Sequence, residues 1–196
     1  MTFEALYLAR HGQTAWNVQR RWQGQLDSPL TEQGRQAAMA LARFVVEHSM
    51  DAVFSSPLTR AQSTATLAAE AVGVELRVLP DLAEVHHGDM AGLTAEEADC
   101  RFPGVRASRE DDKYRWRFPG GESYADADER AARAVLEVQR SGARRPVIVS
   151  HEMIGRMLLR QVAELEPRET LRRTQPHHIV YRVVPATRDV SELSTT

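Results

Sequence analysis

Short, mostly apolar runs alternate along the chain with longer segments whose apolar residues recur at helical spacing. The runs at 5–9, 51–55, 75–79, 146–150 and 179–184 predict strands, and the segments 31–49, 57–72, 123–141 and 152–162 predict helices. Strands that alternate with helices favour a parallel sheet covered on both faces. We therefore predict an α/β fold, a three-layer α/β/α sandwich with a mostly parallel sheet.

Residues that favour helix ends mark several of these boundaries. Ser56 and Pro57 predict an N-cap followed by a proline in the first turn. Ser123 and Asp126 have the spacing of a capping box for the helix that follows. These signals separate helices from loops but do not order the strands.

The sequence predicts one domain over residues 1–196. Prolines and glycines interrupt the segment before residue 123, so we expect a short, irregular, lid-like segment at about 85–122. The residues from about 187 onward are rich in polar side chains and predict a polar tail.

Composition narrows the function classes. The chain has 196 residues, 42% hydrophobic and 27% charged, with a net charge of −2, as in an ordinary globular protein. This charge gives no general attraction to nucleic acid or to anionic membranes, so we expect neither as a partner. A single cysteine, Cys100, and a start without a basic stretch fit a cytoplasmic location. Anion binding would require a local cluster of cations.

Such a cluster is predicted at one edge of the sheet. Arg10, His11 and Gly12 follow the first predicted strand, Arg60 lies one turn into the helix after the second, and His151 follows the strand at 146–150. In open parallel sheets, ligands bind at the carboxyl ends of the strands. Glycine at position 12 would also let the backbone approach a ligand closely.

The segment from Leu8 to Asn17, LARHGQTAWN, resembles the signature of the histidine phosphatase superfamily, the phosphoglycerate mutase-like proteins. Further matches follow in the family's order across about residues 3–184: Gln23-Gly24, DSPLT at 27–31, SSPLTRA at 55–61, Glu84 with Gly88 and Gly92, GGES at 120–123, and VSH at 149–151. The resemblance implies the phosphoglycerate mutase-like fold.

The resemblance also implies a mechanism. His11 would attack the phosphorus of a phosphomonoester and become a phosphohistidine, for which its imidazole must be neutral. Arg10 and Arg60 would lower the pKa of His11, and with a protonated His151 they would donate hydrogen bonds to the phosphoryl oxygens. Because these cations balance the phosphoryl charge, we expect metal-independent transfer with no metal site and no cofactor.

Five further residues complete the expected site. Glu84 would protonate the leaving alkoxide and then activate water. The substrate-binding residues would be Gly12, Asn17, Gln23 and Gly24, with Asn17 as a neutral donor and the backbone near Gly12 as another.

One position departs from the family's pattern. Glu152 follows His151 where the family commonly has glycine. A carboxylate there is favoured by the start of a helix but disfavoured by a bound phosphate dianion. If it pointed into the pocket, it would weaken phosphate binding.

The expected function is a phosphatase for a small phosphorylated metabolite, a phosphoric monoester hydrolase. The compact segment between Arg101 and Gly121 favours this over the alternative, phosphoglycerate mutase-type transfer, because a mutase must shield its phosphohistidine from water. A non-catalytic module that binds a phosphorylated ligand is the third alternative. A homodimer is compatible with the sequence, but no apolar stripe marks its interface.

Overall fold

The computed structural model describes residues 3–196, which form a six-stranded sheet in the order β3-β2-β4-β1-β5-β6. The strands are β1 Leu6–Arg10, β2 Ala52–Ser55, β3 Leu76–Val78, β4 Pro146–Ser150, β5 Ile179–Val184 and β6 Asp189–Ser194. β3, β2, β4 and β1 run parallel to one another, whereas β5 is antiparallel to both of its neighbours, β1 and β6. The predicted mostly parallel sheet is thus confirmed.

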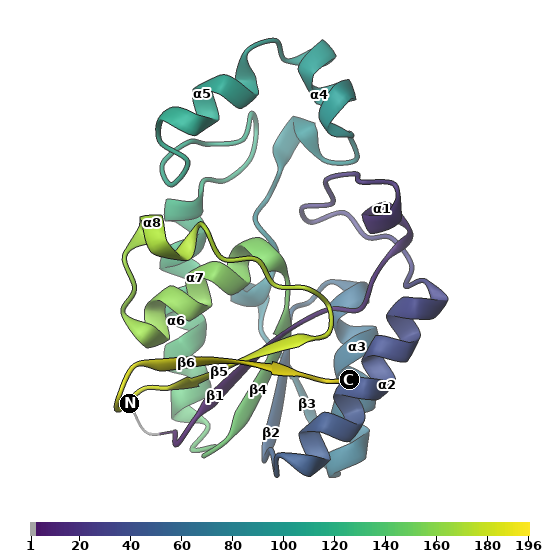
Figure 1. The fold of residues 1–196 in the computed structure, drawn as a ribbon, viewed down its shortest axis with the longest axis vertical. Helices are drawn as coiled ribbons and strands as arrows, with labels where there is room; N and C mark the ends of the chain where they lie inside the picture. Colours follow the sequence, from purple (N-terminus) through teal and green to yellow (C-terminus); the bar gives the residue numbers. More distant parts are fainter. Residues whose placement is uncertain (1–2) are drawn as a thin grey trace.

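Helices cover both faces of the sheet (Figure 1). They are α2 Glu32–Glu47 and α3 Thr59–Val72 on one face, and α6 Tyr124–Arg140 and α7 Glu152–Ala163 on the other. Two short helices, α1 Ala15–Val18 and α8 Pro167–Thr170, lie in connecting segments. Side chains along β1 alternate between two cores: Leu6 and Leu8 join the core with α6 and α7, and Tyr7 and Ala9 join the core with α2 and α3. This period of two explains why the strand is apolar throughout.

The start of α3 differs from the prediction. Leu58, not Ser56, is the N-cap residue, and the hydroxyl of Ser56 accepts a hydrogen bond from the Leu58 N–H. The carboxylate of Asp27, far away in the sequence, accepts from the N–H groups of Thr59 and Arg60. Because this cap comes from another loop, local spacing could not predict it. The capping box of Ser123 and Asp126 is confirmed.

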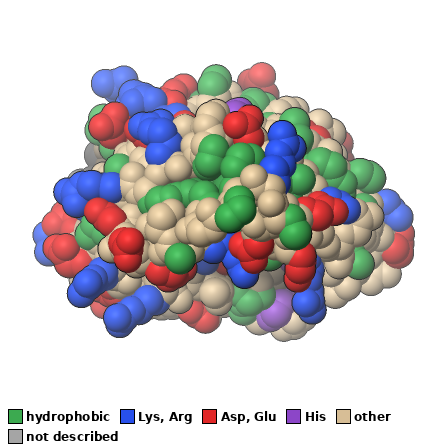
Figure 2. Space-filling model, turned by 90° about the horizontal axis from the view of Figure 1, so that it is seen from above, with side chains coloured by type: hydrophobic (Ala, Val, Ile, Leu, Met, Phe, Trp, Pro, Cys, Tyr) green, Lys and Arg blue, Asp and Glu red, His purple; other side chains and the backbone are tan. Residues whose placement is uncertain are grey.

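The segment at 85–122 stands above the carboxyl end of the sheet (Figure 1). The expectation that it is irregular is wrong for two short helices, α4 Ala95–Arg101 and α5 Val105–Asp111. Thr94 and Glu97 form a capping box at α4 that the sequence analysis missed. Seen from above, the molecule presents acidic and basic side chains interspersed with hydrophobic ones (Figure 2).

The expectation of a polar tail from residue 187 is also wrong, because β6 pairs with β5 along its whole length. Two apolar side chains explain this pairing. Val190 packs against the core with α6 and α7, and Leu193 packs against the core with α2 and α3. Within residues 3–196, no helix is both long and apolar enough to cross a membrane.

Candidate active site

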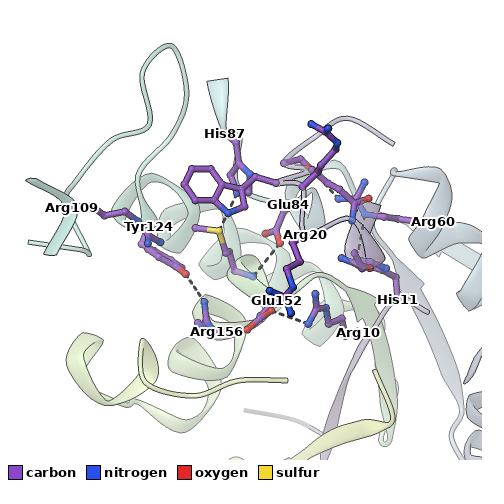
Figure 3. A pocket seen from close by; sticks show the side chains of 16 residues that line it. Arg10, His11, Arg20, Arg60, Glu84, His87, Arg109, Tyr124, Glu152 and Arg156 are labelled. Carbon is purple, nitrogen blue, oxygen red and sulfur yellow. Dashed lines mark hydrogen bonds and ion pairs between the residues drawn. The ribbon is translucent and has the colours of Figure 1, made fainter. Parts of the chain in front are cut away.

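A cavity of about 370 Å³ lies where the carboxyl ends of β1 and β4 meet the segment at 85–122 (Figure 3). The residues of the predicted site that line it are Arg10, His11, Asn17, Gln23, Gly24, Arg60 and Glu84. The fold therefore brings together residues from β1, α1, α3 and three loops, as expected from the strand ends.

His11 follows β1 and is almost fully buried. Its Nδ1 lies 2.7 Å from the carbonyl oxygen of Gly12, which places the ring proton on Nδ1 and leaves a lone pair on Nε2. Burial, and then the charges of Arg60 and Arg10, hold the pKa of His11 well below its usual range. The imidazole is thus neutral, as nucleophilic attack requires; the arginines act as predicted, but burial is the larger cause.

Arg60 is buried beside His11 and rigidly held. Its Nε lies 3.3 Å from Nε2 of His11. Nη1 donates to the Leu26 carbonyl at 2.7 Å and to Asp27 at 2.9 Å, and Nη2 donates to the Gly24 carbonyl at 2.7 Å. These contacts fix the plane of the guanidinium, so that its Nε–H points at the nucleophilic atom.

Arg10 has one engaged edge and one free edge. Its Nη1 donates to the Gln175 carbonyl at 3.0 Å and pairs with Glu152 at 2.8 Å. Its Nε is buried and has no hydrogen-bond partner within residues 3–196. The Nε and Nη2 edge of a guanidinium is the one that binds two oxygens of a phosphate or carboxylate, so this edge can receive an anion.

His151 is the N-cap residue of α7 and is 1% exposed. Its Nε2 lies 2.7 Å from the hydroxyl of Ser56, and its ring centre lies 5.1 Å from that of His11. Burial, then Arg60, His11 and Arg10, hold its pKa well below the usual range. Without a ligand His151 is therefore neutral, which differs from the protonated donor expected from the sequence. A bound dianion would favour that proton.

Glu84 joins the same helix start from a neighbouring loop. One carboxylate oxygen accepts from the N–H groups of Val85 at 2.9 Å and Ile154 at 3.0 Å. The other accepts from the N–H of Met153 at 3.2 Å. The first turn of α7 thus holds Glu84 in the cavity wall. His151 lies next to this turn in the chain, because it is the N-cap residue of α7.

Three of the predicted substrate-binding residues line the cavity. Asn17 accepts two hydrogen bonds from Thr14 on its amide oxygen, which orients its NH₂ group as a donor. Gln23 donates to the hydroxyl of Thr14 at 2.9 Å. Gly24 contributes through its carbonyl, which holds Arg60. These contacts give the cavity polar walls besides the arginines.

Gly12 does not line the cavity. Its N–H donates to the hydroxyl of Thr64 at 3.0 Å instead of facing a ligand. A Cβ atom on Gly12 would lie 2.3 Å from the carbonyl oxygen of Gly34 in α2. The glycine is therefore required by the close approach of α2 to β1, and not by a ligand.

Several lining residues were not predicted as site residues, among them His87, Arg109, Tyr124 and Arg156. The spacing of Glu152 and Arg156 was a usable signal, since residues four apart on a helix form ion pairs. His177, whose Nδ1 lies 2.6 Å from the His11 carbonyl oxygen, had no such signal, because its loop returns to β1 from far along the chain.

Glu152 points toward the cavity, which answers the question that the sequence left open. Its two oxygens pair with Arg10 at 2.8 Å and with Arg156 at 2.7 Å (Figure 3).

Comparison with known proteins places this geometry in a family. The family model described as the histidine phosphatase superfamily (branch 1) matches residues 6–194. The chain belongs to this superfamily, as its motifs predicted.

Two relatives of this chain have names that include a phosphatase activity. Glucosyl-3-phosphoglycerate phosphatase of Mycobacterium tuberculosis (strain CDC 1551) is 39% identical over 160 residues, 77% of this chain and 71% of the relative. The bifunctional 6-phosphofructo-2-kinase/fructose-2,6-bisphosphatase of Gallus gallus is 34% identical over 187 residues, which are 94% of this chain but only 38% of that enzyme.

Solved structures of phosphatases have the same fold as this chain. A mycobacterial glucosyl-3-phosphoglycerate phosphatase superposes with a TM-score of 0.83 at 32% identity, covering 92% of both chains. A putative alpha-ribazole-5'-P phosphatase from Escherichia coli has a TM-score of 0.87 at 20% identity, covers 98% of this chain and 95% of its own, and shares the fold.

Proposed function

We propose that the protein is a phosphatase that hydrolyses a small phosphorylated metabolite through a phosphohistidine on His11. The observation that carries this proposal is the orientation of His11: its Nδ1 proton is held by Gly12, so the Nε2 lone pair lies beside the guanidinium of Arg60. The membership of the superfamily and the names of the relatives support the same reaction.

In the first step, Nε2 of His11 attacks phosphorus and the bond to the ester oxygen breaks. The free edge of Arg10 and the Nε–H of Arg60 would donate to the phosphoryl oxygens. His151 does not itself line the cavity, but its ring lies beside that of His11, and its Nδ1, which has no hydrogen-bond partner within residues 3–196, would meet these oxygens. Fixed donors of this kind stabilise charge that spreads over the oxygens in the transition state.

Glu84 would give its proton to the leaving oxygen as that bond breaks. In the second step, the resulting carboxylate takes a proton from water, the water oxygen attacks phosphorus, and the bond from phosphorus to Nε2 breaks. Phosphate leaves, and Glu84 is protonated again for the next cycle. One carboxylate in one place can serve both steps because the proton returns to it.

The donor set of this cavity consists of guanidinium, imidazole and amide groups, with two carboxylates that are already hydrogen-bonded or ion-paired. Such a set balances phosphoryl charge without a cation. We therefore propose metal-independent hydrolysis without a cofactor.

Mutase-type transfer is the alternative, supported by the likeness to a probable phosphoglycerate mutase of Escherichia fergusonii, 38% identical over 154 residues, 74% of this chain and 68% of the relative. The two reactions differ in their product: a phosphatase releases phosphate, whereas a mutase returns the phosphoryl group to its substrate.

The test is phosphate release from p-nitrophenyl phosphate in EDTA by the wild-type protein and by His11→Ala. We expect turnover by the wild type alone, unaffected by the chelator. Loss of activity in EDTA that magnesium restores would contradict the metal-independent mechanism, and equal turnover by His11→Ala would remove His11 from it.

A further inference from the structure

Glu152 is one of two carboxylates in a cavity whose other charged lining residues are arginines. Its side chain, 25% exposed, lies between Arg10 and Arg156, whose side chains are 17% and 14% exposed. One oxygen of Glu152 contacts Nη1 of Arg10 and the other contacts Nη2 of Arg156. The carboxylate therefore lies directly next to the guanidinium that presents its free edge to a phosphoryl group.

Arg156 holds this carboxylate in place. Its Nε donates to the Arg173 carbonyl at 2.7 Å, and its Nη1 donates to the Tyr124 hydroxyl at 2.6 Å. Every nitrogen of Arg156 is thus engaged, so the guanidinium is fixed on both sides of its bond to Glu152. Because Glu152 is also in the first turn of α7, it has a fixed position at the end of this chain of contacts.

A fixed carboxylate beside the phosphoryl position distinguishes leaving groups by their charge. A hydroxyl group close to the ester oxygen can donate to Glu152, because each carboxylate oxygen has a lone pair beyond the one used by its arginine. A carboxylate at the same place meets a like charge in a partly buried cavity, where screening by water is weak. Arg20 and Arg109 also line the cavity, and Arg109 lies across it from His11 (Figure 3). Glu152 pairs with Arg10 and Arg156 and so withholds these two cations from a substrate carboxylate.

We propose that Glu152 is a specificity-determining residue. It admits phosphomonoesters that carry a hydroxyl group on the carbon next to the ester-bearing carbon, and it excludes those that carry a carboxylate there. This inference rests on the proposed phosphatase function, because it concerns the alcohol that leaves. It also means that the site takes an alcohol phosphate in preference to a phosphorylated hydroxy acid.

A matched pair of substrates tests the inference. 2-Hydroxyethyl phosphate and phosphoglycolate differ only in that the first has a CH₂OH group where the second has a carboxylate next to the ester carbon. We expect the wild type to have a higher kcat/KM for 2-hydroxyethyl phosphate, and Glu152→Gln to reduce that preference by about tenfold or more, chiefly by lowering KM for phosphoglycolate. An unchanged preference in Glu152→Gln would overturn the inference.

Two controls keep this test decisive. Glu32→Gln removes the same charge from an exposed ion pair on α2 and is expected to leave the preference as in the wild type. Glu152→Ala replaces the glutamine variant if thermal unfolding shows that the latter is not folded.

A binding experiment separates this inference from the proposed function. Calorimetric dissociation constants of the two compounds are measured for His11→Ala and for His11→Ala/Glu152→Gln. Weaker binding of phosphoglycolate that Glu152→Gln relieves supports the inference even if the wild type turns over neither compound, an outcome that would count against the phosphatase function alone. Equal ratios in the two variants would refute the inference.

Discussion

The Nε atom of Arg60 lies 3.3 Å from Nε2 of His11, the atom that carries the lone pair of the imidazole. A guanidinium in this position adds to the effect of burial in keeping His11 neutral and, once a phosphoryl group arrives, becomes a donor to it. The remaining contacts of Arg60, with Leu26, Asp27 and Gly24, leave it little freedom to turn away. The neutral state of His11 and the stabilisation of the transferred phosphoryl group therefore both depend in part on Arg60.

Replacing Arg60 by alanine removes this donor, and we expect kcat/KM to fall by about 10²- to 10³-fold, the usual loss when one fixed donor to a transition-state oxygen is removed. Steady-state kinetics with p-nitrophenyl phosphate measures the loss, with circular dichroism as a check on folding. Arg35→Ala, which breaks an exposed pair on α2, is the matched control. An unchanged kcat/KM in Arg60→Ala would exclude Arg60 from the reaction.

Replacing Glu84 by glutamine removes the acid but keeps one of the two oxygens that accept from the N–H groups of α7. We expect alkyl phosphates to be hydrolysed about 10² to 10⁴ times more slowly, the usual contribution of general acid catalysis. Aryl phosphates are expected to lose less in the first step, because their leaving groups need less protonation. Rates for one alkyl and one aryl phosphate decide the matter, with Glu47→Gln as control, and equal losses would argue against Glu84 as the acid.

Gly12→Ala is expected to lower the free energy of unfolding by about 1–3 kcal/mol or more, the range for overpacked sites, because the new Cβ meets backbone that cannot move aside easily. Gly142→Ala is the comparison: its φ of 75° disfavours alanine, but apart from its two chain neighbours no other residue within 3–196 has an atom within 4 Å of the new Cβ. Urea unfolding of both variants measures the difference. A Gly12→Ala protein as stable as Gly142→Ala would show that α2 can withdraw from β1.

Buried histidines make stability depend on pH. Burial and Arg10 lower the pKa of His177 to about 4, and burial and Arg109 lower that of His87 to about 3. Below about pH 6.5 the unfolded chain binds protons that the folded protein rejects, so stability falls as pH decreases from about 6.5 toward 4, by up to about 1.4 kcal/mol per pH unit for each such histidine.

His177→Gln is expected to make this dependence less steep by about one proton, whereas Thr174→Gln, at a nearby exposed position without a titratable side chain, is expected to leave it unchanged. Urea unfolding at several pH values between about 7.5 and 5 gives the slopes. A slope in His177→Gln equal to that of the wild type would mean that His177 does not titrate as its surroundings imply.

The sequence predicted the sheet well because its central strands are apolar on both faces and its helices have clear apolar stripes. The strand ends then placed Arg10, His11 and His151 together, which required only the general rule for parallel sheets. Glu84 was predicted as a site residue from the family resemblance alone. Nothing in the sequence around it indicates that this carboxylate accepts hydrogen bonds from the first turn of α7.

What the sequence could not predict are contacts between segments far apart in the chain. Asp27 caps α3, Arg156 reaches Glu152 and Tyr124 together, and His177 contacts the carbonyl of His11. The strand at β6 was missed because Val190 and Leu193 are isolated among polar residues, and only the two cores beneath them explain their burial.

The proposed mechanism requires that His11 carries the phosphoryl group during turnover. To detect this intermediate, the wild type is mixed with an excess of p-nitrophenyl phosphate, the reaction is quenched at alkaline pH, where phosphohistidine is preserved, and the intact mass and the modified peptide are recorded. We expect the mass of one added phosphoryl group, located on His11 and absent from His11→Ala. Hydrolysis without that modification, or the phosphoryl group on another residue, would contradict this mechanism.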